Sequence, residues 1–544
     1  MTRLILAVCL SLAVQHVLAQ AQVTSQSETE QTSLDIRPID TVGLSSGLKW
    51  AETITAEELR VHAYILASDS LQGRETGTEG QYKAAKYLAQ EMSKLGLPRV
   101  GNEYSYEQRI AFERSSWDMV RFSIAGKSYR HLRDFYGFPA EANDVASDYS
   151  EVMFLGYGIE TEGYSDFKNA GDLRGKVVII LDGEPFDKKG ISQVTGTADT
   201  SNWSRELSLK RAAAAQRGVE VLLVVKSEIQ AEIAEVRSKI IDNSLKLGDP
   251  NKVANTTLPT VLHISPKLFR ELIGKNTKQV IKARKRMAKK GVSKSTPLPT
   301  QLDLELKPRK FVLTGSNVLG YIRGRDPKLA DEIVVVSAHY DHLGMRNDNV
   351  FNGADDNASG TSTVLEITQA LAAAAAKGEG PRRSVLTLFV SGEEKGLLGS
   401  EFYAANPVFP LANTVADINI DMIGRYDEEH ADSSAYIYVI GAGRISPDLD
   451  ATTRAINDQY AKLELDYTFD ALDDPNRFYY RSDHYNFAKN GVPSVFFFSG
   501  VHEDYHRITD TPDKLDYNKM EIVGRNAFLI AWNLANRDGK LNRK

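Results

Sequence analysis

The stretch IVVVSAHYDH, residues 333–342, decides the fold class of this 544-residue chain. Its first half is apolar and has the length of a buried strand, and ionisable side chains come directly after it. Similar short apolar runs recur downstream, at residues 385–390, 417–420, 437–440 and 495–498. Helical patterns lie between them, including residues 361–376 and 396–404. This alternation predicts an α/β fold with a mixed, mostly parallel sheet and helices on both of its faces.

The size and composition of the chain narrow its class. At 544 residues it exceeds one ordinary hydrophobic core, so we expect two or three domains. With 42% hydrophobic residues, 25% charged residues and a formal net charge of -6, it reads as a globular protein. This mild acidity argues against a nucleic-acid partner.

The first residues have the pattern of an export signal. Arg3 precedes an apolar run over residues 4–14, and the small residue Ala19 offers a cleavage point, so residues 1–19 predict a secretory signal peptide. A membrane anchor is the alternative, although the run is shorter than the ~20 residues that a spanning helix needs. Cys9 is the only cysteine and would leave with the signal, so any metal must be held by His, Asp and Glu. We expect a periplasmic or extracellular protein without stable membrane insertion after cleavage.

Changes of composition and of apolar pattern along the chain indicate the domain organisation. Residues 20–48 lack periodic apolar positions and predict a mobile leader. We expect the main α/β domain to comprise residues 49–140 and 305–544, interrupted by a smaller domain over residues 141–304. Within that insertion, the strongly basic run 275–294 favours a solvated helix or loop over a site for an anionic ligand. A glycine-rich loop that contains Arg74 is expected to be a simple connector.

Ionisable residues lie directly after the predicted strands, at the carboxyl ends where open α/β sheets place their sites. In extended chain His339 and Asp341 point to the same side, so an imidazole can face a metal while a carboxylate orients its ring. In GADDNASG, residues 353–360, Asp355 and Asp356 stand side by side. Adjacent carboxylates repel unless a cation or hydrogen bonds compensate, and helix capping explains one of them more easily than two.

Three further motifs carry acids and a histidine. Glu393 and Glu394 come after a predicted strand, so that one can bind metal while the other handles protons. Asp421 interrupts an apolar stretch, and a buried carboxylate needs a partner. His506 lies in a loop near the C-terminal end of the sheet. Taken singly, these motifs also fit a solvated turn, a buried ion pair and a solvated histidine. Yet half of the ten histidines gather around these strand ends, at positions 339, 342, 484, 502 and 506.

The ordered series HYDH, GADDNASG, SGEEKGLLGS, NIDMIG, SDH and DYHRITDT resembles the zinc-dependent aminopeptidase family of secreted bacterial enzymes. That family is related to glutamate carboxypeptidase and glutaminyl cyclase, and the resemblance covers most of residues 313–535. It implies two Zn²⁺ ions bridged by Asp356. His339 and Asp421 would complete one zinc site, and Glu394 and His506 would complete the other.

The same resemblance assigns the remaining catalytic roles. Glu393 would be the general base, and Asp341 would be the partner that orients His339. Two zinc ions can bind a water between them and polarise a scissile carbonyl, and carboxylates suit the free α-amine of a peptide substrate. Deprotonated ligands imply activity near neutral or alkaline pH. The expected reaction is hydrolysis of N-terminal residues from peptides.

The inserted segment resembles a protease-associated domain through its VMFLGYGIE, DLRGKVVIILDGEPF and VEVLLVV stretches. Such a domain is expected to cover the active-site cleft and to influence which peptides enter. A purely structural insertion is the alternative, because function resides in sites rather than folds.

Two other functions stay open at this point. A carboxypeptidase or a cyclising enzyme on the same fold would keep the metal chemistry. The carboxypeptidase would need a basic residue for the free carboxylate, for which Arg425 and Arg507 are candidates, and the cyclase would bind one zinc. A non-catalytic binding protein that retains the fold would not need Glu393.

Overall fold

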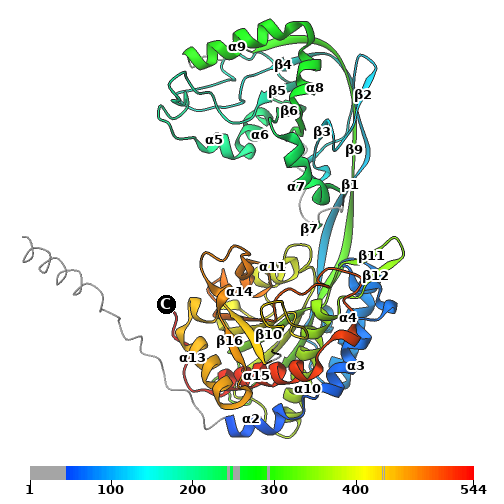
Figure 1. Ribbon diagram of the computed structural model, residues 1–544, viewed down its shortest axis with the longest axis vertical. Helices are drawn as coiled ribbons and strands as arrows, with labels where there is room; N and C mark the ends of the chain where they lie inside the picture. The colour runs from blue at the N-terminus through cyan, green and yellow to red at the C-terminus, as the bar shows by residue number, and fades with distance from the viewer. Residues whose placement is uncertain (1–43, 242–244, 249–257, 291–294, 432, 434) are drawn as a thin grey trace, which may run out of the picture.

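The computed structural model describes residues 44–544 except 242–244, 249–257, 291–294, 432 and 434. It has two lobes joined by a long ribbon of two strands, β1 (Glu107–Ile124) and β9 (Thr296–Ile322) (Figure 1). The strands pair antiparallel, from Glu107 opposite Val318 to Ile124 opposite Leu302. Both strands run from one lobe into the other, and most of the chain between them forms the second lobe.

Most of the predicted N-terminal segments lie outside the described residues. These are the signal peptide, the membrane-anchor alternative and the leader up to residue 43. The prediction that the leader extends to residue 48 is wrong, because helix α2 (Leu44–Ala51) begins earlier. Gly47 lies against the Trp532 ring, where a Cβ atom would come within 2.7 Å of Trp532 Cδ1, so this glycine lets the helix approach the core. Among the residues described, no helix combines the length and the apolar character needed to cross a bilayer.

The larger lobe is built on a mixed, mostly parallel sheet, which confirms the predicted fold class. Strand β10 (Ile333–His339) pairs in parallel with both β13 (Ser384–Val390) and β14 (Thr414–Ile420), and β14 pairs in parallel with β17 (Ser494–Phe498). On the far side, β15 (Tyr436–Ile440) is antiparallel to β17 and parallel to β16 (Glu464–Asp466). On the near side, β9 is antiparallel to β13.

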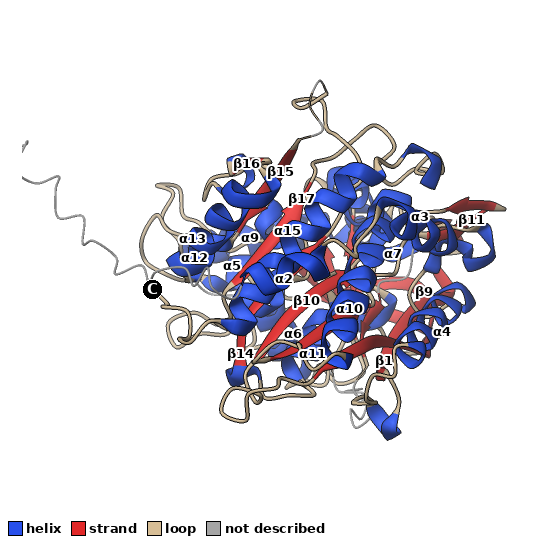
Figure 2. Cartoon of the chain, turned by 90° about the horizontal axis from the view of Figure 1, so that it is seen from below, coloured by secondary structure: helices blue, strands red, loops and turns tan. Residues whose placement is uncertain are grey.

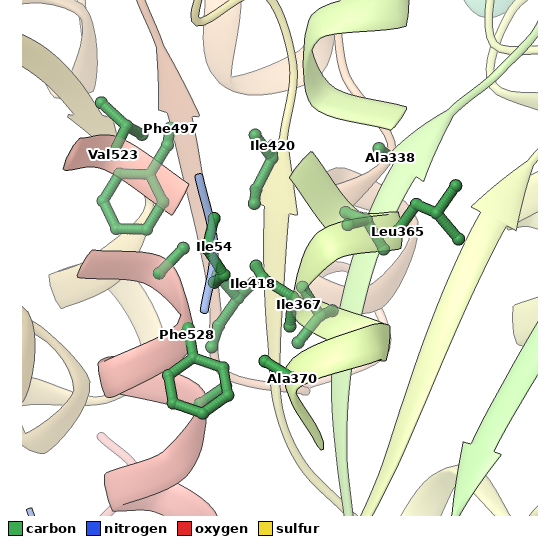
Figure 3. Close-up of a cluster of buried hydrophobic side chains, with 14 of the residues drawn as sticks. Ile54, Ala338, Leu365, Ile367, Ala370, Ile418, Ile420, Phe497, Val523 and Phe528 are labelled. Atoms are coloured by element: carbon green, nitrogen blue, oxygen red, sulfur yellow. The ribbon is translucent and has the colours of Figure 1, made fainter. Parts of the chain in front are cut away.

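Helices cover both faces of this sheet because neighbouring strand residues point to opposite sides (Figure 2). Val334 and Val336 belong to a core cluster that includes residues of α3 (Ala56–Leu66), α4 (Glu79–Lys94), α10 (Gly360–Ala376) and α15 (Tyr517–Asn536). Figure 3 shows part of it, with Ile418 of β14 beside Ile367 of α10. Val335 lies in a separate cluster with residues of α11 (Leu398–Ala405) and α14 (His484–Ala488).

The smaller lobe has its own parallel strands and its own core. Strands β4 (Val145–Phe154), β5 (Val177–Leu181), β6 (Val221–Val225) and β8 (Thr260–Ile264) pair in parallel in that order. Its helices include α6 (Leu207–Ala215), α7 (Ile229–Ile241), α8 (Pro266–Ile273) and α9 (Thr277–Lys290). Phe122 and Phe135 pack in the same cluster as Leu304 and Leu306. The core of the smaller lobe therefore extends beyond the predicted boundaries. It includes residues before residue 140 and a residue after residue 305.

The ribbon places the smaller lobe relative to the ends of the larger sheet. Phe389, near the carboxyl end of β13, lies opposite Val318 of β9. Because the two strands are antiparallel, the residues of β9 that precede Val318 project beyond that carboxyl end. The smaller lobe therefore stands on the side of the sheet at which β10, β13 and β14 end.

Candidate metal centre

Functional side chains gather at the carboxyl ends of the neighbouring strands β10, β13 and β14. This edge of the sheet collects the residues that come directly after each parallel strand. The side chains come from the end of β10, from the loops after β13, β14 and β17, and from the turn before α10: His339, Asp356, Glu393, Glu394, Asp421 and His506. All five residues predicted to ligate metal, and the predicted base, therefore reach one region of the larger lobe.

The first group of ligands contains one histidine and two aspartates. The Nε2 atom of His339 lies 3.3 Å from Asp356 Oδ1 and 3.2 Å from Asp421 Oδ1. All three side chains are buried, and their ligand atoms lie within 4.8 Å of one another. Ser482 donates a hydrogen bond of 2.7 Å to Asp421 Oδ2, which leaves Oδ1 free to face the group.

The second group shares Asp356 with the first. The other oxygen of this carboxylate, Oδ2, lies 3.1 Å from Nε2 of His506, and Glu394 Oε2 lies 3.3 Å from the same nitrogen. Asp356 thus directs one oxygen toward each group. This is the arrangement expected of a carboxylate that bridges two metal ions.

A further histidine, His342, belongs to the same region, although the sequence motifs predicted no role for it. Its Nδ1 atom lies 2.8 Å from Glu394 Oε1 and 3.7 Å from Asp356 Oδ2, and its side chain is completely buried, whereas His506 is 35% exposed. A Cβ atom at Gly353 would lie 2.4 Å from the His342 ring, so this position needs glycine. The signals in the sequence were the second histidine of HYDH and the glycine that opens GADDNASG.

The donor atoms of this region fit metal ions. Both ring nitrogens of His342 and the Oε1 atom of Glu394 are buried. Among the described residues none of these three atoms has a hydrogen-bond partner, although Nδ1 of His342 lies close to Oε1 of Glu394. Buried polar atoms without partners are costly, and so are several carboxylates in one buried site without a cation. Imidazole nitrogens and carboxylate oxygens are ligands that zinc accepts. Divalent metal would satisfy these atoms and neutralise the acids.

The pKa values of two acids in this region, Asp356 and Glu393, are shifted in opposite directions. Burial would raise the pKa of Asp356, but His342, His339 and His506 hold it well below its usual value. Burial raises the pKa of Glu393 well above its usual value; His339 opposes this, and Glu394 adds to it. An acid that stays ionised suits a metal ligand, and one with a raised pKa suits a proton carrier. The two acids therefore differ in the direction in which their pKa values are shifted.

The sequence from Asn317 onward matches a known family. Residues 317–531 fit the model of peptidase family M28. The matched segment is less than half of the chain, and we call the larger lobe that contains it the M28 domain. This segment contains every residue of the two groups and the predicted base.

Known proteins are similar to part of this chain. A probable leucine aminopeptidase of Arthroderma otae is 33% identical over 221 residues, which cover 39% of this chain and 57% of that protein. A probable zinc metalloprotease of Pyricularia oryzae is 26% identical over 272 residues, which cover 42% of this chain and 51% of that protein. The chain thus spans a little over half the length of these curated relatives.

The fold itself has a counterpart among solved structures. An aminopeptidase from Aneurinibacillus sp. strain AM-1 aligns with a TM-score of 0.51 and 17% identity, over 92% of this chain and 98% of that chain. At this identity the likeness shows the fold alone. Because it covers nearly the whole chain, it includes both lobes.

Within the M28 domain, the carboxylate of Asp341 does not make the close contact with His339 that its predicted role suggests. The carboxylate oxygen Oδ1 lies 3.8 Å from Nδ1 of His339, whereas the backbone oxygen of Asp341 lies 3.1 Å from that nitrogen. The carboxylate instead accepts hydrogen bonds from the backbone N–H of Glu393 at 3.2 Å and from the hydroxyl of Thr76 at 2.7 Å. Asp341 thus orients the histidine through its backbone and holds the loop of the base through its side chain.

Arg74 ties together the loops around the M28 site. Its guanidinium is completely buried and donates hydrogen bonds to four backbone carbonyls, those of Leu66, Tyr340, Asn352 and Gly353. Tyr340 is next to His339, and Gly353 precedes the turn that carries Asp356. The predicted connector loop therefore has a structural task, which is to hold the backbone on both sides of the ligands.

We expect the substitution Arg74→Ala to destabilise the M28 domain by about 3 kcal/mol or more, because it leaves several buried carbonyls without a donor. Calorimetric unfolding of the variant and of Arg323→Ala, which removes an exposed arginine of the same domain, measures this effect. Equal transition temperatures for the two variants would show that Arg74 does not hold these loops.

Proposed function

We propose that the protein is a co-catalytic di-zinc aminopeptidase, which hydrolyses the N-terminal peptide bond of peptides. The observation that carries this proposal is the shared carboxylate of Asp356, with one oxygen toward His339 and Asp421 and the other toward Glu394 and His506. The M28 domain and the relatives described as leucine aminopeptidases support it.

The chain offers two sets of ligands. His339, Asp356 and Asp421 would hold one ion, and Asp356, Glu394 and His506 would hold the other, with His342 close to the second. Bound zinc would polarise the scissile carbonyl and increase the acidity of the attacking water. The surrounding carboxylates provide the negative potential that a substrate ammonium group requires.

In this proposal Glu393 moves the proton of the reaction. It takes a proton from the attacking water and later delivers it to the leaving amine. The hydrogen bond from its backbone N–H to Asp341 fixes the position of the loop, and its raised pKa favours reversible protonation. No other residue is needed to carry the proton between the two steps.

A pocket beside Glu393 and Asp421 supports an apolar preference at the substrate N-terminus. The apolar lining of the pocket comprises Met422, Phe478, Phe496, Phe498 and Val501. Aromatic and aliphatic walls favour burial of an apolar side chain. We therefore propose leucine-like or aromatic N-terminal residues as the preferred substrates.

The carboxypeptidase alternative needs an arginine that can bind a substrate carboxylate, and one arginine is placed for this. Arg425, a residue considered for carboxylate binding, is already engaged, since its guanidinium lies 3.0 Å from Asp504 Oδ2. Arg507 is exposed in the loop beside His506. Arg481, in contrast, lines the pocket itself and stacks on Phe478 at 4.7 Å. A guanidinium at this place can receive a carboxylate, so carboxypeptidase action is the second candidate.

Two further assignments belong to this proposal. We propose that the protein is exported by its N-terminal signal, as the first residues predict. We also propose that the smaller lobe, which resembles a protease-associated domain, influences the access of peptides. Its position on the same side of the sheet as the metal ligands supports this role.

Hydrolysis of free and N-acetylated peptides, with and without a zinc chelator, tests the proposed function. We expect cleavage only of substrates with a free N-terminus, fastest for leucine and phenylalanine, with loss of activity upon chelation and recovery with added zinc. Cleavage of N-blocked peptides from the other end would establish the carboxypeptidase instead. Cyclisation of N-terminal glutamine with one zinc per chain would establish the cyclase, and binding without turnover would establish a binding protein.

A further inference from the structure

A strongly basic segment lies in the smaller lobe, away from the metal ligands. Between residues 274 and 290 the chain has eight Lys and Arg residues and no acidic residue, which gives a formal charge of +8. The rest of the chain therefore carries a formal charge of -14. So large a separation of charge along one chain creates a strong local potential.

Helix α9 presents four of these eight charges on one face. Val280 and Met287 are 2% and 1% exposed and pack into the core of the smaller lobe. The opposite face carries the lysine stripe, which we define as four exposed lysines: Lys278, Lys282, Lys285 and Lys289. Their spacing of four, three and four residues aligns them on one side of a helix. Ile281 lies beside the stripe and is 45% exposed.

The lysine stripe has no acidic partner among the described residues. None of its members forms an ion pair there, although Lys127 of the same lobe pairs with Glu271 at 3.1 Å. Like charges three and four residues apart repel along a helix. The repulsion within the lysine stripe therefore destabilises helix α9, and an anionic partner would relieve this repulsion.

The position of α9 suits contact with a large surface. Figure 1 shows the helix at the end of the long axis of the molecule, on the outside of the smaller lobe and away from the M28 domain. It lies across that end of the molecule. A flat surface can therefore reach the whole stripe without touching the other lobe.

We propose that α9 docks the protein on an anionic lipid bilayer, with the lysine stripe against the headgroup phosphates. The exposed Ile281 beside the lysines favours a bilayer interface over a purely ionic polymer, because a bilayer also accepts apolar side chains. The negative charge of the rest of the chain turns the M28 domain away from the membrane and toward solution. This docking is adsorption at the surface and needs no inserted segment.

Co-sedimentation with vesicles tests this docking. We expect the protein to bind vesicles of phosphatidylcholine and phosphatidylglycerol, but not vesicles of phosphatidylcholine alone, and to dissociate at high salt. The combined variant Lys278→Gln, Lys282→Gln, Lys285→Gln and Lys289→Gln is expected to lower the partition coefficient by about 100-fold or more. Glutamine keeps the helix propensity and relieves the repulsion, so the variant is expected to fold.

A matched control separates the stripe from total charge. The variant Lys86→Gln, Lys328→Gln, Lys377→Gln and Lys489→Gln removes four exposed lysines of the larger lobe, and we expect unchanged vesicle binding. Peptidase activity in solution is expected to be the same in both variants. Equal binding to neutral vesicles, equal loss in both variants or no binding of the native protein would overturn the proposal. Retention on heparin without vesicle binding would also overturn it and assign the stripe to a soluble polyanion.

Discussion

Replacement of Glu393 by Gln is expected to lower kcat by about 10³- to 10⁴-fold, with zinc content unchanged. Glutamine has nearly the same shape but cannot accept the proton of the attacking water. In the proposed mechanism, the raised pKa of Glu393 and its half-buried position beside both ligand groups suit a proton carrier. Steady-state kinetics with a leucine substrate, together with metal analysis of the same sample, measures both parts of the expectation.

Glu401→Gln provides the control for this variant. Glu401 is an exposed residue of α11, the helix after the loop of Glu393, so its substitution removes one charge without touching the site. We expect this control to keep full activity. If Glu393→Gln retained activity within about tenfold of the native protein, another group would have to carry the proton. A loss of zinc in that variant would instead make Glu393 a ligand.

Replacement of Asp356 by Asn is expected to lower the affinity for zinc by more than about 100-fold and to reduce activity to that of chelator-treated protein. Asp356 is the one carboxylate that faces both groups of ligands, so loss of its charge weakens both sites at once. Titration of the metal-free variant with zinc, followed by activity measurement, tests this expectation. Retention of two tightly bound ions would show that the two groups do not share this bridge.

The neighbouring Asp355 is a natural comparison, because it is equally buried but points elsewhere. Its Oδ1 accepts a hydrogen bond of 2.7 Å from the backbone N–H of Gly424, and its Oδ2 lies 3.2 Å from Nε2 of His502. We expect Asp355→Asn to keep its zinc and to lose stability. If zinc were lost in Asp355→Asn and kept in Asp356→Asn, the assignment of this acidic pair would have to be reversed.

The sequence was most informative where function depends on the residues directly after a strand. The apolar runs predicted the central strands to within a few residues, because a buried parallel strand needs a nearly continuous apolar segment. The ordered motifs after these strands pointed to the residues that the structure then brings together. The chemical type of each ligand is a local property, so residue identity alone carried it.

Other features were beyond any local pattern. Residues 107–124 and 296–322 form one ribbon, and their pairing joins parts of the chain that lie far apart in sequence. The side chains of a strand alternate between its two faces whether the strand lies in one lobe or runs between two lobes. The predicted domain boundaries therefore matched changes of composition, whereas the two hydrophobic cores separate within the ribbon.

The sequence by itself determined the fold class, the resemblance to zinc aminopeptidases and the chemical character of the site, because these depend on periodicity and on residue type. The tertiary structure decided which atoms meet. It brought the unassigned His342 next to Glu394, turned the carboxylate of Asp341 toward the loop of the base, and placed aromatic residues around one pocket. Such contacts depend on the register of distant strands and on the course of the loops, where a shift of one residue changes the face to which a side chain points.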